Sequence, residues 1–146
     1  MAVSTEAVGK TFPAGVYAVG REKIREYAHA VGETNPLHLN VEAARAAGYA
    51  DVVAPRMFAV VYSAPAMAPA ILDPQVGINL PAMVHGGQEF AWGAPVVAGD
   101  EITTTATVKD ISERNGMGFY VFESESRNQD GETVCTGTWT NIVRGA

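Results

Sequence analysis

Hydrophobic positions in the first part of the chain recur with helical spacing. Apolar residues at i, i+3, i+4 and i+7 predict an amphipathic helix whose buried stripe is made by Ile24, Tyr27, Ala28 and Val31. Gly32 directly follows, where a left-handed helix cap is common. A short strand over 16–19 is expected before this helix. A second short helix over 41–47 is expected after it, with Asn40 as its cap and Gly48 at its end.

The run over 57–72 is apolar on nearly every side, which predicts a helix surrounded by other structure. Pro55 is expected in its first turn, where a missing N–H costs little. Pro65 and Pro69 are expected to kink or end it. Because the run is interrupted and falls short of the roughly 20 apolar residues that span a bilayer, a buried helix is the better interpretation.

From Gln88 onward the hydrophobic period changes from helical spacing to two. Polar and apolar residues alternate over 101–109, and the segment over 134–143 is rich in Thr, Val and Ile. Both patterns are typical of strands. Asn115-Gly116 and Asp130-Gly131 are strong hairpin signals, because tight primed turns need positive φ. An antiparallel meander packed on one long helix is an α+β fold.

Composition and charge narrow the classes of function. The chain has 146 residues, of which 47% are hydrophobic and 18% charged, and its formal net charge is −6. This is ordinary for a folded protein and predicts one domain over 1–146. The acidic balance argues against a nucleic-acid-binding protein, which would carry a basic patch. The single cysteine, Cys135, excludes an internal disulfide and any multi-cysteine metal site. With no signal-peptide pattern in the first ten residues and no membrane span, a cytoplasmic protein is expected.

The stretch with candidate chemistry is Gly32-Glu33-Thr34-Asn35-Pro36-Leu37-His38. It places a carboxylate and an imidazole five residues apart in a loop between two predicted helices. A folded loop can bring Glu33 and His38 to one point, where they could share a water molecule and move protons near neutral pH. A surface turn decorated by two polar side chains has the same spacing, and the residues alone leave both interpretations open.

This stretch resembles the signature of the (R)-specific enoyl-CoA hydratases and MaoC-like dehydratases, Gly-Asp-x-Asn-Pro-x-His. Four positions match, and Glu33 stands where the family has aspartate. Further segments, over 21–28, 47–49, 53–55 and 95–100, are similar to the actinobacterial fatty-acid-synthase-type dehydratase subunits. The resemblance implies a single hot-dog domain, in which a curved antiparallel sheet wraps a central helix.

The resemblance also implies an activity, the reversible hydration of trans-2-enoyl thioesters to (R)-3-hydroxyacyl thioesters of CoA or acyl carrier protein. Carried over from the family, Glu33 would be the base for the attacking water, and His38 would orient that water and shuttle a proton. The backbone N–H of Arg56 would stabilise the thioester oxygen at the start of the central helix. The family has His-Gly-Met where this chain has Pro55-Arg56-Met57.

Asn35 is a further candidate for substrate binding. Three residues of the central helix, Met57, Phe58 and Tyr62, are expected in the core by default, and in a hot-dog fold their side chains could also border an acyl tunnel. No cofactor or metal is implied. Because the acidic chain should repel the phosphates of CoA, local basic residues would have to receive them, and Arg56 is the first candidate.

The sequence leaves more than one possibility for the assembly and for the activity. Hot-dog domains pair through their sheets, so a homodimer or a heterodimer with a homologous hot-dog subunit is expected. The extra methylene of Glu33 displaces its carboxylate by roughly 1 Å unless the loop shifts, which can cost ~100-fold in rate. One alternative is therefore a non-catalytic acyl-binding subunit of a heterodimeric dehydratase. Another is an acyl-CoA thioesterase, because these enzymes also use hot-dog folds.

Overall fold

A curved antiparallel sheet and one central helix organise the computed structural model, which describes residues 2–145. The helical elements are α1 (Arg21–Ala30), α2 (Pro36–Leu39), α3 (Val41–Ala46), the 3-10 turn η1 (Arg56–Phe58), α4 (Ala59–Ile71) and the 3-10 turn η2 (Leu80–Ala82). The strands are β1 (Gly15–Ala18), β2 (Met83–Trp92), β3 (Glu101–Arg114), β4 (Met117–Arg127) and β5 (Thr133–Arg144).

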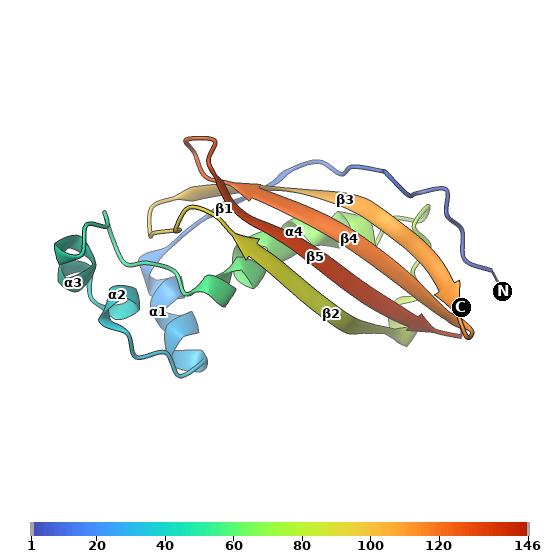
Figure 1. Ribbon diagram of the computed structural model, residues 1–146, viewed down its shortest axis with the longest axis horizontal. Helices are drawn as coiled ribbons and strands as arrows, with labels where there is room; N and C mark the ends of the chain where they lie inside the picture. Colours follow the sequence, from blue (N-terminus) through green and yellow to red (C-terminus); the bar gives the residue numbers. More distant parts are fainter. Residues whose placement is uncertain (1, 146) are drawn as a thin grey trace.

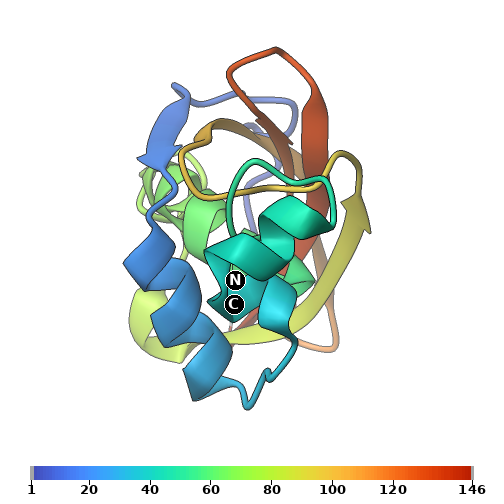
Figure 2. The same ribbon diagram turned by 90° about the vertical axis from the view of Figure 1, so that its left-hand side faces the viewer.

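The sheet has the strand order β1-β3-β4-β5-β2, and every neighbouring pair is antiparallel. The predicted meander is confirmed for β3, β4 and β5, which follow one another in the chain. The two edges, β1 and β2, come from earlier in the sequence. The sheet lies along α4, and α1, α2 and α3 gather at one end of the molecule (Figures 1 and 2). This is the predicted α+β hot-dog arrangement.

The central helix is longer than its prolines suggest. Pro65 and Pro69 do not end it, and it continues to Ile71. Both prolines lie on its exposed side, where water can satisfy the carbonyls that lose an N–H partner. Pro55 is the N-cap of η1 and stands just before the first turn, whereas it was expected inside that turn. No helix within residues 2–145 is long and apolar enough to cross a membrane.

The buried core consists of two clusters along the sheet. One contains Phe122 and Met67, and it lies between the C-terminal part of α4 and the strands β3 and β4. The other contains Phe58, Ile24 and Tyr62 and joins α1 to the start of α4. Since Phe58 and Ile24 are fully buried, this second cluster fixes the end of the molecule at which the three short helices gather.

The two hairpin signals produce different turns. Asn115 and Gly116 have φ values of 53° and 72° and form the tight two-residue turn between β3 and β4, as predicted. The turn at Asp130-Gly131 is longer, since the loop between β4 and β5 spans 128–132. Its shape is held by the Asn128 side chain, whose oxygen accepts the N–H groups of Asp130 and Glu132.

Candidate active site

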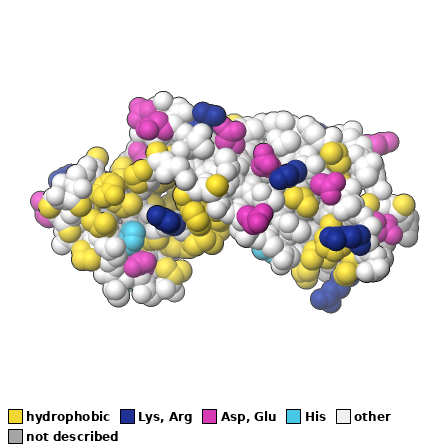
Figure 3. Space-filling view, in the orientation of Figure 1, with side chains coloured by type: hydrophobic (Ala, Val, Ile, Leu, Met, Phe, Trp, Pro, Cys, Tyr) yellow, Lys and Arg dark blue, Asp and Glu magenta, His cyan; other side chains and the backbone are white. Residues whose placement is uncertain are grey.

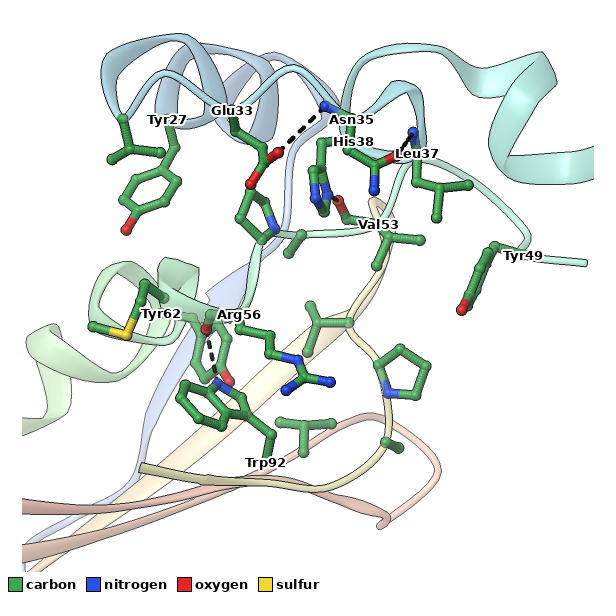
Figure 4. Close-up of a pocket in the computed structure, with 18 of the residues that line it drawn as sticks. Tyr27, Glu33, Asn35, Leu37, His38, Tyr49, Val53, Arg56, Tyr62 and Trp92 are labelled. Atoms are coloured by element: carbon green, nitrogen blue, oxygen red, sulfur yellow. Dashed lines mark hydrogen bonds between the residues drawn. The ribbon is translucent and has the colours of Figure 1, made fainter. Parts of the chain in front are cut away.

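A cavity of about 1020 Å³ opens at the helical end of the molecule. Its walls come from the loop between α1 and α2, from the segment over 53–57 that leads into α4, and from the segment over 92–96 after β2. Figure 3 shows hydrophobic side chains gathered at this end, with acidic, basic and histidine side chains among them. Figure 4 shows the side chains that line the cavity. The predicted pair, Glu33 and His38, is brought together in this one wall.

Glu33 is placed by the way α1 ends. The N–H of Glu33 donates to the carbonyl of Ala28 at 2.7 Å, and the N–H of Gly32 donates to that of His29 at 3.2 Å. These two bonds form a Schellman motif, which needs a left-handed residue after the helix cap. Gly32 has φ +73° and supplies it. The glycine therefore turns the chain so that Glu33 leaves the helix toward the cavity.

The Glu33 carboxylate is held by its own loop. One oxygen accepts the N–H of Thr34 at 3.2 Å and that of Asn35 at 3.3 Å. These two hydrogen bonds fix the orientation of the carboxylate. The side chain is half-buried and points into the cavity beside His38 (Figure 4). It is thus an oriented carboxylate, suited to accept a proton.

His38 is positioned by the short helix α2, which the sequence presented as a loop. The side-chain oxygen of Asn35 accepts the N–H of Leu37 at 3.0 Å and caps this helix, and Pro36 occupies its first turn. Asn35 lines the cavity as expected, with this structural function in addition. The cap fixes the direction from which His38 enters the cavity.

The tautomer of His38 follows from its contact with Val53. Nδ1 of His38 lies 2.6 Å from the Val53 carbonyl, and the N–H of Val53 donates to the Leu37 carbonyl at 2.8 Å. A carbonyl only accepts, so Nδ1 carries the proton of the neutral ring and Nε2 presents its lone pair. The imidazole is therefore oriented as a hydrogen-bond acceptor for a water in the cavity.

The start of the central helix forms the opposite wall. The amides of Arg56 and Met57 begin η1, and the first N–H groups of a helix have no partner within it. The Arg56 carbonyl accepts the indole N–H of Trp92 at 2.9 Å, and the guanidinium of Arg56 lies 5.8 Å from the centre of the Trp92 ring. Trp92 thus holds both the backbone and the side chain of Arg56.

The three residues expected to border an acyl tunnel occupy different places. Met57 is exposed and Tyr62 is buried, and both line the cavity. Phe58 does not line it: the ring is fully buried, in edge contact with Tyr17, Tyr27 and Tyr62. Burial, with a smaller contribution from Cys135, raises the pKa of Tyr62 well above its usual range. Its phenol therefore stays protonated at the cavity wall.

Several lining residues were not predicted as site residues. Val31 was assigned to the buried stripe of α1, but it is the C-cap residue, is exposed and lines the cavity. Tyr27, Tyr49 and Trp92 also line it. Among residues 2–145, no three His, Cys, Asp or Glu side chains gather in a way that could hold a metal ion.

Comparison with known proteins identifies the family to which the chain belongs. Residues 6–137 match the family described as FAS1-like, dehydratase domain region. The chain belongs to this family. The chain is 47% identical over 146 residues to the UPF0336 protein of Clavibacter michiganensis, covering 99% of this chain and 98% of that protein.

Solved structures of dehydratases are similar throughout the chain. A MaoC-like dehydratase superposes with a TM-score of 0.86 at 30% identity, covering 97% of this chain, and this chain spans only 43% of that longer one. The HadBC (3R-hydroxyacyl-ACP dehydratase) complex from Mycobacterium tuberculosis superposes with a TM-score of 0.80 at 29% identity, covering 94% of this chain and 98% of that one. The MaoC-like dehydratase resemblance is therefore confirmed, together with the hot-dog fold.

Proposed function

We propose that this FAS1-like dehydratase domain catalyses the reversible hydration of trans-2-enoyl thioesters to (R)-3-hydroxyacyl thioesters. The observation that carries the proposal is the pairing of Glu33 and His38 in one cavity wall, opposite the backbone amides that begin η1. The first supplies a base and a proton carrier. The second supplies donors for a thioester oxygen, and the dehydratase family membership agrees with both.

In the hydration direction, one water lies between the Glu33 carboxylate and Nε2 of His38. As the water oxygen bonds to C3 of the substrate, its proton passes to Glu33, and electrons move to the thioester oxygen. A proton then returns to C2 through this pair, so that OH and H have been added across the double bond. Because Nδ1 of His38 is engaged by Val53, Nε2 is the nitrogen that takes part.

The thioester oxygen gains negative charge before C2 is protonated. The N–H of Arg56 is the donor that we assign to it, because a backbone donor at a helix start faces the developing charge without reorganising. The family has glycine where this chain has Arg56, but a backbone N–H is present with either residue. The hydrogen bond from Trp92 to the Arg56 carbonyl keeps this peptide in place.

The test is hydration of crotonyl-CoA by the purified chain, followed by loss of the enoyl-thioester absorbance. Glu33→Gln keeps a side-chain oxygen for the Thr34 and Asn35 amides but removes the base, so kcat should fall by about 10²–10⁴-fold. His38→Ala should fall similarly. Glu42→Gln, at an exposed carboxylate on α3 outside the cavity, is the matched control and should retain the wild-type rate. Full activity in Glu33→Gln or His38→Ala would refute the assignment.

A second candidate is an acyl-binding subunit that needs a homologous hot-dog partner, and similarity to the HadBC complex favours it. The edge strand β2 supports pairing with a second hot-dog chain, because its outer side has no strand partner within residues 2–145. It also exposes Val84 and Trp92. Open edges and exposed apolar side chains of this kind mark association surfaces.

The two candidates differ in what the isolated chain does. An enzyme hydrates crotonyl-CoA alone, as a homodimer whose mass is measured on the same sample. An acyl-binding subunit becomes active only after a homologous partner is added. Release of free thiol from saturated acyl-CoA would instead identify a thioesterase.

A further inference from the structure

The cavity contains an arginine side chain that has no acidic partner in the described part of the chain. The guanidinium of Arg56 projects into the cavity above Trp92 (Figure 4), and Arg56 forms none of the ion pairs found among residues 2–145. The arginines on α1 and α3, the helices at this end, do have partners: Arg21 pairs with Asp51, Arg25 with Glu22 and Arg45 with Glu42. Among the lysine and arginine residues of a chain of net charge −6, Arg56 is the one that lines the cavity.

Trp92 contacts both the backbone and the side chain of Arg56, which is an exposed residue. The Trp92 indole N–H bonds the Arg56 carbonyl at 2.9 Å, and the Trp92 ring lies under the guanidinium at 5.8 Å. Neighbouring walls are apolar and include Val53, Pro95 and Val96. A planar guanidinium so held is suited to bind a carboxylate or phosphate through two parallel hydrogen bonds. The shared chemistry of its ligand is therefore an oxyanion on the substrate.

The length of the Arg56 side chain limits where on the substrate this anion can lie. This step rests on the proposed function. With the Arg56 N–H on the thioester oxygen, six bonds of side chain carry the guanidinium about 7 Å away at most. The nearest phosphate of CoA or acyl carrier protein is thirteen bonds from the thioester sulfur, about 16 Å along an extended arm. The anion within reach is therefore on the acyl group, and not on the carrier.

We propose that Arg56 binds a carboxylate carried by the acyl group, so that the cavity selects enoyl thioesters of dicarboxylic acids. This ligand is an alternative to the expectation that Arg56 receives the phosphates of CoA. A neutral acyl group would offer the guanidinium no ion-pair partner. An acyl group that bears a carboxylate would pair with it. The selectivity then resides in the side chain of a residue whose backbone holds the thioester.

The experiment compares two substrates of similar length, glutaconyl-CoA, which carries a terminal carboxylate, and trans-2-hexenoyl-CoA, which is neutral. In the wild type the ratio of kcat/KM, glutaconyl over hexenoyl, should be about 10 or more, as expected for a hydrogen bond between charged groups. Arg56→Gln should lower this ratio to about 1, and Arg56→Lys should restore part of it.

The matched control is Arg114→Gln. Arg114 is also stacked on an aromatic ring, at 4.2 Å from the centre of Phe119, but it lies at the β3–β4 hairpin outside the cavity. Its substitution should leave the ratio unchanged. Equal losses for both substrates in Arg56→Gln would overturn the proposal.

Pantetheine thioesters of the same two acids distinguish the carboxylate from the carrier phosphate. If Arg56 binds phosphate, Arg56→Gln weakens both CoA thioesters and neither pantetheine thioester, which overturns the proposal. Calorimetric Kd values for both CoA thioesters separate this proposal from the hydration reaction. If neither compound is hydrated but Arg56→Gln still abolishes the preference in Kd, the proposed function fails and the carboxylate site stands. If both are hydrated without preference, the site fails and the function stands.

Discussion

Replacing Gly32 with alanine tests whether the end of α1 positions the proposed base. Gly32 has φ +73°, and a Cβ built there meets nothing within 4 Å. The cost is therefore purely conformational, about 1 kcal/mol for an L residue in the left-handed region. For a chain of this length that corresponds to a fall in Tm of about 2–4 °C. The strain acts on the bond between Glu33 and Ala28, so the carboxylate should shift and hydration of crotonyl-CoA should fall by about 10–100-fold.

Gly131→Ala is the matched substitution for this test. Gly131 has φ +79° and equally open surroundings, but it lies in the β4–β5 loop outside the cavity. Thermal unfolding and crotonyl-CoA hydration are measured on both variants. The two should lose similar stability, and only Gly32→Ala should lose activity. If Gly32→Ala keeps the full rate while its Tm falls, the Schellman turn does not control the carboxylate and the reasoning is wrong.

Three further predictions concern stability and reactivity. Asn35→Ala removes the cap of α2, and Asn40→Ala removes that of α3, so each should lower the free energy of unfolding by about 1 kcal/mol. Only Asn35→Ala should also slow hydration, because α2 contains His38. Burial raises the pKa of the Cys135 thiol, so iodoacetamide at pH 8 should label the native protein far more slowly than the unfolded one, by mass spectrometry. The bonds from Arg21 hold the pKa of the Asp51 carboxyl below its usual range, so this pair stabilises the fold above about pH 4 and less as pH falls through the lowered pKa. Asp51→Asn should therefore cost less than about 1 kcal/mol at pH 7 in urea unfolding, and the difference from wild type should vanish in acid.

The sequence predicted β3 from its alternation of polar and apolar residues. In β3 the alternation succeeds because Ile102, Thr104, Ala106 and Val108 are all fully buried and their neighbours are not. The first half of β2 was missed because the alternation breaks there. A register shift lies between His85 and Gly87, and a Cβ at Gly86 would stand 2.5 Å from the Ile142 side chain. Gly86 at this bulge thus interrupts the alternation that would have indicated the strand.

The candidate site was predictable where it is local in the chain. Glu33, Asn35 and His38 lie within six residues, and their signature points to one loop. The contact between Trp92 and Arg56 could not be predicted, because it depends on the edge position of β2. Which of Met57, Phe58 and Tyr62 faces the cavity could not be predicted either, since a run that is apolar on nearly every side does not indicate which residue lines a cavity.

The strand order has a consequence for how the chain folds. The hairpins β3–β4 and β4–β5 close through short loops, whereas β2 pairs with β5 across the whole of β3 and β4. Pairing that is distant in sequence carries a larger loop-closure entropy, so the meander should nucleate folding and β2 should dock late. Trp92 is the last residue of β2, and its indole N–H donates to the Arg56 carbonyl in the cavity wall. We therefore expect the cavity to be completed only after the meander has formed, so a ligand that bridges its two walls should slow amide hydrogen exchange in β2.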